Sequence, residues 1–280
     1  MKKINSNLQD LYTDLQHLVA PGSLCCDEPL SAHTTFKIGG PADIFVTPQT
    51  MLQLSQVLAA IHKAGVPLTV LGSGSNVLVL DGGIRGVVLS LSDMRETMAA
   101  IDGVLTISAG YMLKDASEFA YAAGLTGLEF AIGIPGTLGG AVFMNAGAYG
   151  GEMCQVVTKV RAVDMAGQVR EYSAEELAFA YRHSRFHESH EIIGEVDIRL
   201  KDGDKDEILA SWKILRNAVR VSNPLNMPVR DLRLNGHRDI LQGRSLSRPV
   251  LRASLWVMRK CPKNTPVLLL IKDRHRLRMC

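Results

Sequence analysis

Two stretches of small residues in this chain have the composition of a ligand-binding surface. The first, GLTGLEFAIGIPGTLGGAVFMNAGAYGG at 124–151, holds nine of the chain's 25 glycines and one charged residue, Glu129. Glycines let a ligand approach the backbone closely, and the apolar residues between them indicate a buried loop. The stretch therefore favours binding of a phosphate or a flat aromatic cofactor through backbone N–H groups. A purely structural turn between packed elements is the alternative.

The second stretch, LGSGSNVLV at 71–79, leads from one expected strand through small polar residues into another. The side chains of Ser73, Ser75 and Asn76 add donors for phosphate oxygens. The stretch is not a Walker loop, because no Lys-Ser/Thr pair follows, and its glycine spacing does not fit the Rossmann fingerprint. A tight connection between two strands is the structural alternative.

A third candidate is the arginine in YRHSRF at 181–186. Arg182 lies among aromatic residues, and burying its guanidinium without a partner costs too much free energy. One interpretation is an ion pair with Glu175 or Glu176; the other is a group that stabilises an anion or an enolate. No metal site is expected, because the histidines nearby lack further ligands at a suitable spacing.

The composition is that of a soluble protein with one large or two ordinary domains. The chain has 280 residues, of which 46% are hydrophobic. No apolar run approaches the ~20 residues of a membrane span, so no membrane insertion is expected. The polar N-terminus does not fit a signal peptide. The five cysteines are odd in number and lack metal spacing, which indicates a reduced, cytoplasmic setting.

The spacing of apolar residues predicts an α+β fold without regular alternation of strands and helices. Helices are expected at 5–19, 50–64, 112–123, 174–186 and 205–221. Strands are expected as two short strands in 34–48, three strands in 67–91, hairpins at 99–110 and 156–173, and one strand at 191–201. Ser173 and Glu176 fit a capping box, and Asp102-Gly103 fits a hairpin turn.

The character of the chain changes at Val229. From there to Cys280 it has ten Arg, three Lys, three Asp and no Glu, a net charge of +10, whereas the first 228 residues carry −7. Such a break indicates that the last segment differs in kind from the rest. It lacks interleaved aromatic residues and any nucleic-acid-binding motif, so no nucleic-acid partner is expected.

Four segments together resemble the UDP-N-acetylenolpyruvoylglucosamine reductase family. They are HTTFKIGGPADIF, LGSGSNVLVLDGGIRGVVL, GLEFAIGIPGTLGGAVFMNAGAYGGE and ELAFAYRHSRF, and the resemblance covers about residues 5–228. It implies an FAD-binding domain of the vanillyl-alcohol-oxidase/PCMH type. It also implies that NADPH reduces the flavin, which passes hydride to the enolpyruvyl double bond of a UDP-sugar, giving UDP-N-acetylmuramate for peptidoglycan synthesis. The expected protein is a cytoplasmic monomer.

The resemblance also assigns roles to residues. Arg182 is expected to stabilise the enolate formed by hydride addition. The residues expected to line the FAD are Gly72, Ser73, Gly74, Ser75, Asn76, Gly133, Ile134, Pro135, Gly136, Thr137, Gly139, Gly140, Ala141 and Asn145. The expected divisions of the chain are an N-terminal helix and lead-in at 1–27, the FAD-binding domain at 28–201, the start of a substrate domain at 202–228, and a basic tail at 229–280.

The chain departs from the family after PLNMP at 224–228. The family continues with S-A-G-S, whose Ser protonates the enolate carbon, and a Glu near its C-terminus assists. This chain reads PVRDLRLNGHRDILQGR instead and has no Glu after residue 228. An alternative function follows, a flavin-binding remnant without turnover that lacks the Ser proton donor and the C-terminal Glu.

A frameshift explains this departure. Codons can be chosen for Val229–Gln242 so that the same nucleotides, read one base out of frame, encode SAGSTFKRPPGYFA, which contains the family's missing motif. Codons for the later segment CPKNTPVLLLIK similarly permit VSQKHTGFVIN, which is also family-like. The hypothesis is that a one-base frameshift near codons 228–229 left a truncated or scrambled substrate domain and an out-of-frame, poorly ordered tail that is prone to aggregate at 267–271. Sequencing the gene tests it: if no single-base change opens a frame through both motifs, the hypothesis is wrong.

Overall fold

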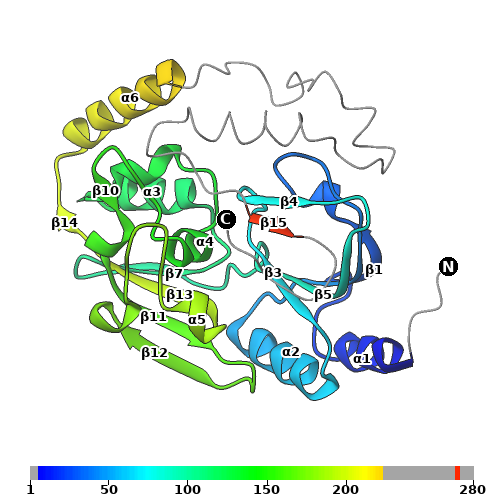
Figure 1. Ribbon diagram of the computed structural model, residues 1–280. Coiled ribbons are helices and arrows are strands. Elements are labelled where there is room, and N and C mark those ends of the chain that lie inside the picture. Colours follow the sequence, from blue (N-terminus) through cyan, green and yellow to red (C-terminus); the bar gives the residue numbers. More distant parts are fainter. Residues whose placement is uncertain (1–5, 223–268, 272–280) are drawn as a thin grey trace.

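The structure is a computed structural model that describes residues 6–222 and 269–271 (Figure 1). The chain forms two main sheets, each packed against helices. Helices and strands do not alternate regularly along the chain, so the predicted α+β class is confirmed.

The first sheet has four strands in the order β1-β2-β5-β3. Their bounds are β1 (Leu24–Pro29), β2 (Pro41–Val46), β3 (Leu68–Leu71) and β5 (Ile84–Ser90). β5 runs parallel to both β2 and β3, and β1 is antiparallel to β2. β5 is buried along most of its length, as expected for a hydrophobic strand with neighbours on both sides. Helices α1 (Ser6–Gln16) and α2 (Met51–Ala64) share a core with this sheet.

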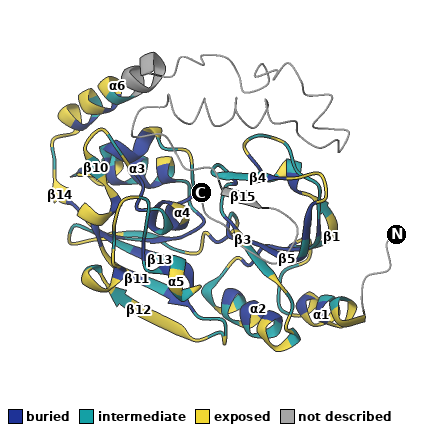
Figure 2. Ribbon diagram, in the orientation of Figure 1, coloured by how far each residue is buried: buried dark blue, intermediate teal, exposed yellow. Residues whose placement is uncertain are grey.

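The second sheet has five antiparallel strands in the order β12-β11-β13-β7-β6. Their bounds are β6 (Met98–Ile101), β7 (Val104–Ser108), β11 (Val157–Val163), β12 (Val169–Ser173) and β13 (Ile192–Arg199). The largest core lies between this sheet and helices α3 (Leu113–Ala122) and α4 (Leu138–Phe143). Figure 2 shows that the edge strand β12 is mostly exposed.

The remaining strands and α-helices of the described part of the chain are short, except for α6. They are β4 (Val77–Val79), β8 (Leu125–Thr126), β9 (Gly147–Ala148), β10 (Gly151–Glu152), β14 (Lys201–Asp202), β15 (Leu269–Ile271), α5 (Phe186–Ser189) and α6 (Lys205–Ser222). β8 pairs with β14, β9 with β10, and β4 in parallel with β15. Among the described residues, no helix combines the length and apolar character that crossing a membrane requires.

Local signals explain where several elements begin and end. Thr50 caps α2 by accepting a hydrogen bond from the Gln53 N–H, and Gly65 ends the helix with φ 63°. Asp102 and Gly103 both have positive φ, as the two-residue hairpin turn between β6 and β7 requires. The predicted helices at 5–19, 50–64, 112–123 and 205–221 and the predicted strands of 67–91 are confirmed with small changes of boundary.

Two predictions of secondary structure are wrong. The segment 34–48 holds one strand rather than two, and β1 was not expected. The helix expected at 174–186 is a 3₁₀ helix, Ala174–Leu177, which has the predicted capping box of Ser173 but ends where Ala178 takes φ 47°. A residue in the left-handed conformation cannot continue a right-handed helix, so the helix ends there.

The expected divisions of the chain stay a prediction, although two of the expected boundaries fall inside strands. The boundary after residue 27 cuts β1, and the boundary after residue 201 cuts β14. The tail expected at 229–280 lies outside the described residues except for β15. Three residues of the segment expected to aggregate, 267–271, are therefore paired with β4.

Candidate functional site

The two stretches of small residues lie against each other, and each comes from a different half of the fold. The Ser75 hydroxyl donates to the Pro135 carbonyl at 3.0 Å and accepts from the Ser73 hydroxyl at 3.4 Å. A Cβ on Gly72 would lie 2.7 Å from Oγ1 of Thr137, so a side chain at 72 would force Thr137 to shift. The structure thus brings together the two loops that the family resemblance predicted to line one cofactor.

We call residues 72–76 and 133–141 the cradle. A third segment, residues 33–35, packs against it. The Thr35 N–H donates to the Gly74 carbonyl at 3.2 Å. Gly74 has φ 63°, and a Cβ there would meet the His33 carbonyl and lie 2.8 Å from Cα of Thr34. The sequence interpretation missed this contact, although the HTTFKIGG segment was part of the family resemblance. It joins residues about forty positions apart, which no local pattern reveals.

The cradle offers backbone donors rather than charge. It contains no Asp, Glu, Lys or Arg. Within the part of the chain that the structure describes, the backbone N–H groups of the cradle that have no hydrogen-bond acceptor include those of Ser73, Gly74, Ser75, Gly136 and Thr137. Clustered N–H groups of this kind form a concave site for phosphate oxygens. The residues present therefore fit the diphosphate of a dinucleotide cofactor.

The rest of the predicted cradle supports these loops. Gly133 ends the 3₁₀ helix Glu129–Gly133, and Gly139, Gly140 and Ala141 lie in α4. The Leu138 N–H donates to the Tyr111 carbonyl at 2.8 Å, and the Gly139 N–H to the Ala109 carbonyl at 3.0 Å. These two groups hold α4 to the segment after β7 and are not free for a ligand. That all the cradle residues contact FAD stays a prediction.

Arg182 occupies a two-residue turn. Ala180 and His183 exchange backbone hydrogen bonds, each 3.2 Å long, and Arg182 has φ 56°. Within the described residues, it makes no ion pair with Glu175 or Glu176, so that interpretation is wrong. The carboxylate of Glu176 instead accepts from the Ser173 N–H at 2.8 Å. Arg182, a half-buried residue, therefore has no carboxylate partner in the part of the chain that the structure describes.

Asn145 does not point its amide at open space. Its Oδ1 accepts from the Cys154 N–H at 2.9 Å, and its Nδ2 donates to Glu152 and to the Ala180 carbonyl, both at 3.1 Å. The side chain is 5% exposed. Its side-chain polar atoms are thus engaged within the protein, its backbone N–H donates to the Val142 carbonyl at 3.1 Å, and cofactor binding by Asn145 stays a prediction.

A histidine packs beside the arginine turn. The His187 ring stacks on the Phe143 ring with centroids 3.9 Å apart. It also stacks on the His183 ring, with centroids 4.9 Å apart. Burial lowers the pKa of His187 below 6.5, and His183 lowers it further, against an opposing hydrogen bond to the Ser184 carbonyl. The neutral imidazole is therefore the form that the fold favours.

We expect this burial to make stability depend on pH. Between the lowered pKa of His187 and 6.5, the unfolded chain binds more protons than the folded chain. The free energy of unfolding therefore falls as the pH drops through about 6.5. Urea unfolding at about pH 7.5 and pH 5.5 measures the loss, which we expect to be smaller in His187→Asn. An equal loss in both proteins would contradict the prediction.

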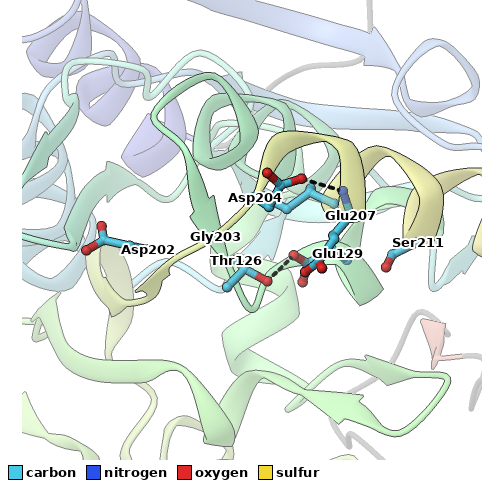
Figure 3. Close-up of a pocket in the computed structure, with 8 residues that line it drawn as sticks. Thr126, Glu129, Asp202, Gly203, Asp204, Glu207 and Ser211 are labelled. Carbon is cyan, nitrogen blue, oxygen red and sulfur yellow. Dashed lines mark hydrogen bonds between the residues drawn. The ribbon is translucent and has the colours of Figure 1, made fainter.

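A separate cavity of about 340 Å³ lies beside α6, where sequence reasoning expected no site (Figure 3). Two of the four carboxylates that line it have structural partners. Glu129 accepts from Thr126 Oγ1 at 2.6 Å and from the Gly127 N–H at 2.9 Å, and Asp204 accepts from two N–H groups at the start of α6. The described residues include no cluster of three or more His, Cys, Asp or Glu suited to a metal ion. The cradle is therefore the better candidate site.

Comparison with known proteins agrees with this location. The family described as "FAD binding domain" matches residues 42–173, which include both loops of the cradle. The UDP-N-acetylenolpyruvoylglucosamine reductase of Clostridioides difficile is 41% identical over 220 residues, which are 79% of this chain and 72% of that protein. That of Heliobacterium modesticaldum is 46% identical over 202 residues, 72% of this chain and 64% of that protein.

Solved structures give the same result. The UDP-N-acetylenolpyruvylglucosamine reductase of Thermus caldophilus is 36% identical, with a TM-score of 0.61, over 70% of this chain and 69% of that one. Phl p 4, a grass pollen allergen with glucose dehydrogenase activity, is 17% identical with a TM-score of 0.56 over 70% of this chain and 45% of that one, and shows only a shared fold. The predicted FAD-binding fold of the PCMH type is confirmed. The chain belongs to the UDP-N-acetylenolpyruvoylglucosamine reductase family.

Proposed function

We propose that this chain binds FAD in the cradle and reduces UDP-N-acetylenolpyruvoylglucosamine to UDP-N-acetylmuramate with NADPH, a step of peptidoglycan synthesis. One observation carries the proposal. Two glycine-rich loops from different halves of the fold meet through Ser75 and Pro135, and the surface they make has open N–H groups and no charge. A diphosphate needs donors of this kind.

The residues of the cradle have distinct tasks in this proposal. The N–H groups of Ser73, Gly74 and Ser75 would donate to the diphosphate of FAD, and those of Gly136 and Thr137 would donate from the opposite loop. The bound flavin supplies the transfer of hydride from NADPH to the substrate. The glycines keep side chains away from the cofactor, and the buried strands behind them hold the loops in place.

Arg182 would act on the substrate. Adding hydride to an α,β-unsaturated carboxylate places developing negative charge on the carboxylate oxygens. A guanidinium presents paired N–H donors that match a carboxylate and stays protonated throughout. Arg182 has no carboxylate partner among the described residues, so its donors are available for this charge. Stabilising charge that appears in the transition state accelerates the reaction.

The test has two stages. Purified protein should carry FAD, seen as yellow absorbance, and should oxidise NADPH only when the UDP-sugar is present. Colourless protein that takes up no FAD on titration would overturn cofactor binding. Bound FAD with no substrate-dependent oxidation would overturn the reaction.

The second candidate is a flavin-binding remnant without turnover. Two observations favour it. The chain has no Glu after residue 228 and no S-A-G-S after PLNMP, and its matches span 72% and 64% of the two curated relatives described above. This candidate predicts that NADPH reduces the bound flavin while no UDP-N-acetylmuramate forms. Measuring flavin reduction and product in the same sample separates the two candidates.

We also propose that the protein works in the cytoplasm as a monomer and does not bind nucleic acid. The cysteines that the structure describes, Cys25, Cys26 and Cys154, are free thiols, which suits a reducing compartment. Light scattering of the eluted protein tests the monomer. Salt-dependent retention of the protein on immobilised DNA would contradict the proposal that it does not bind nucleic acid.

A further inference from the structure

The turn that carries Arg182 is attached to the end of α4 by two buried side chains. The hydroxyl of Ser184, which is 0% exposed, donates to the Phe143 carbonyl at 2.7 Å. The amide of Asn145 donates to the Ala180 carbonyl at 3.1 Å. One bond thus holds each side of the turn, just before Tyr181 and just after His183.

The side chain of Asn145 is itself held in place. Asn145 follows α4 with φ 40°, a conformation that asparagine tolerates better than most residues. Its amide oxygen accepts from the Cys154 N–H, and its second donor interaction is with Glu152. With both ends of the amide bonded, the side chain has one orientation. The Ala180 carbonyl is therefore held at a defined place.

Both hydrogen bonds attach the turn to the C-terminal end of α4, the helix that begins at the cradle. Thr137 is the N-cap residue of α4, Phe143 is its last residue, and Asn145 follows two residues later. A helix of six residues is about 9 Å long and stiff over that distance. The same short helix therefore joins the loop that faces the cofactor to the turn that carries the arginine.

We propose that Asn145 and Ser184 are positioning residues that hold Arg182 in a fixed place relative to the cradle. The role in turnover rests on the proposed function, whereas the attachment of the turn does not. A catalytic guanidinium has to be placed within a fraction of an ångström of its working position. Arg182 lies on a short turn, which moves easily unless neighbouring groups restrain it.

The first experiment needs no activity. Trypsin cuts after arginine, and cleavage at the Arg182–His183 bond requires the turn to open. We expect Ser184→Ala and Asn145→Gly to raise the initial rate of cleavage at this bond about tenfold, the effect of losing one buried hydrogen bond. Glycine at 145 keeps the left-handed backbone accessible. Mass spectrometry of the released peptides measures this bond separately from all others.

The matched control is Ser117→Ala. Ser117 is a buried serine of α3 whose hydroxyl donates to the Leu128 carbonyl at 2.9 Å. Removing this hydroxyl deletes a similar buried hydrogen bond elsewhere in the fold and leaves the turn untouched. We expect no change in cleavage at Arg182–His183. If Ser117→Ala and Ser184→Ala raise this rate equally, the attachment of the turn is wrong.

The second experiment measures turnover in the FAD-loaded protein. Ser184→Ala should lower kcat about tenfold, leave flavin reduction by NADPH unchanged, and be rescued by Ser184→Thr, which restores the hydroxyl. Faster cleavage with unchanged kcat would overturn the positioning role. If the unmodified protein reduces no UDP-sugar, the proposed function is wrong, and the cleavage rates still decide whether the two residues hold the turn.

Discussion

Replacing Arg182 by methionine should lower kcat by about 10²- to 10³-fold while the protein still binds FAD. That is the usual loss when one donor that stabilises transition-state charge is removed. Methionine keeps much of the apolar length of arginine but none of its five donors. Arg182 lies outside the cradle and makes no ion pair within the described residues, so the fold should tolerate the change. Substrate-dependent oxidation of NADPH measures kcat, and flavin absorbance measures occupancy.

Two controls make this result specific to the position. Arg182→Lys keeps the charge and loses the paired donors, and should recover only part of the activity. Arg199→Met removes an exposed arginine of β13 that donates to the Asp102 carbonyl at 3.3 Å, and should leave kcat unchanged. Equal losses for Arg182→Met and Arg199→Met would indicate a general effect of charge. Full activity in Arg182→Met would contradict the role of Arg182.

The sequence predicted the loops of this site better than it predicted the arginine turn. Residues 72–76 and 133–141 could be located because clustered glycine, serine and proline strongly favour turns and loops. The turn was expected to be helical, because the apolar spacing of 174–186 has a helical period. Its actual course depends on distant partners. The Ser184 hydroxyl reaches Phe143, forty-one residues away, and the Arg185 N–H donates to the Leu177 carbonyl.

The same reasoning explains the unexpected strand β1. LCCDEP has no alternation of buried and exposed residues, and its pattern in the fold is irregular. It is a strand because it pairs with β2 from Leu24 to Pro29, and pairing partners are not visible in a local window. The contact of His33 and Thr34 with Gly74 was missed for the same reason. Long-range register therefore accounts for most of what the sequence did not predict.

Replacing Gly74 by alanine should unfold the cradle locally and abolish FAD binding. The residue has φ 63°, which costs an L-residue about 1–2 kcal/mol. The new Cβ would also meet the His33 carbonyl and Cα of Thr34, which are backbone atoms that cannot rotate away. We expect the free energy of unfolding of the FAD-free protein to fall by about 2–4 kcal/mol. FAD affinity should fall at least ~100-fold, because the donors around Gly74 would move.

Gly82→Ala is the matched comparison. Gly82 also lies in a tight turn between strands, but a Cβ there has no atom within 4 Å. Its φ is not in the left-handed range, so alanine should change stability by less than about 0.5 kcal/mol. Urea unfolding and FAD titration of both variants measure the contrast. Comparable effects at the two positions would mean that any added side chain in these loops is harmful. A normal FAD affinity in Gly74→Ala would mean that the diphosphate is held elsewhere, because the 72–76 loop cannot keep its conformation with a Cβ against His33.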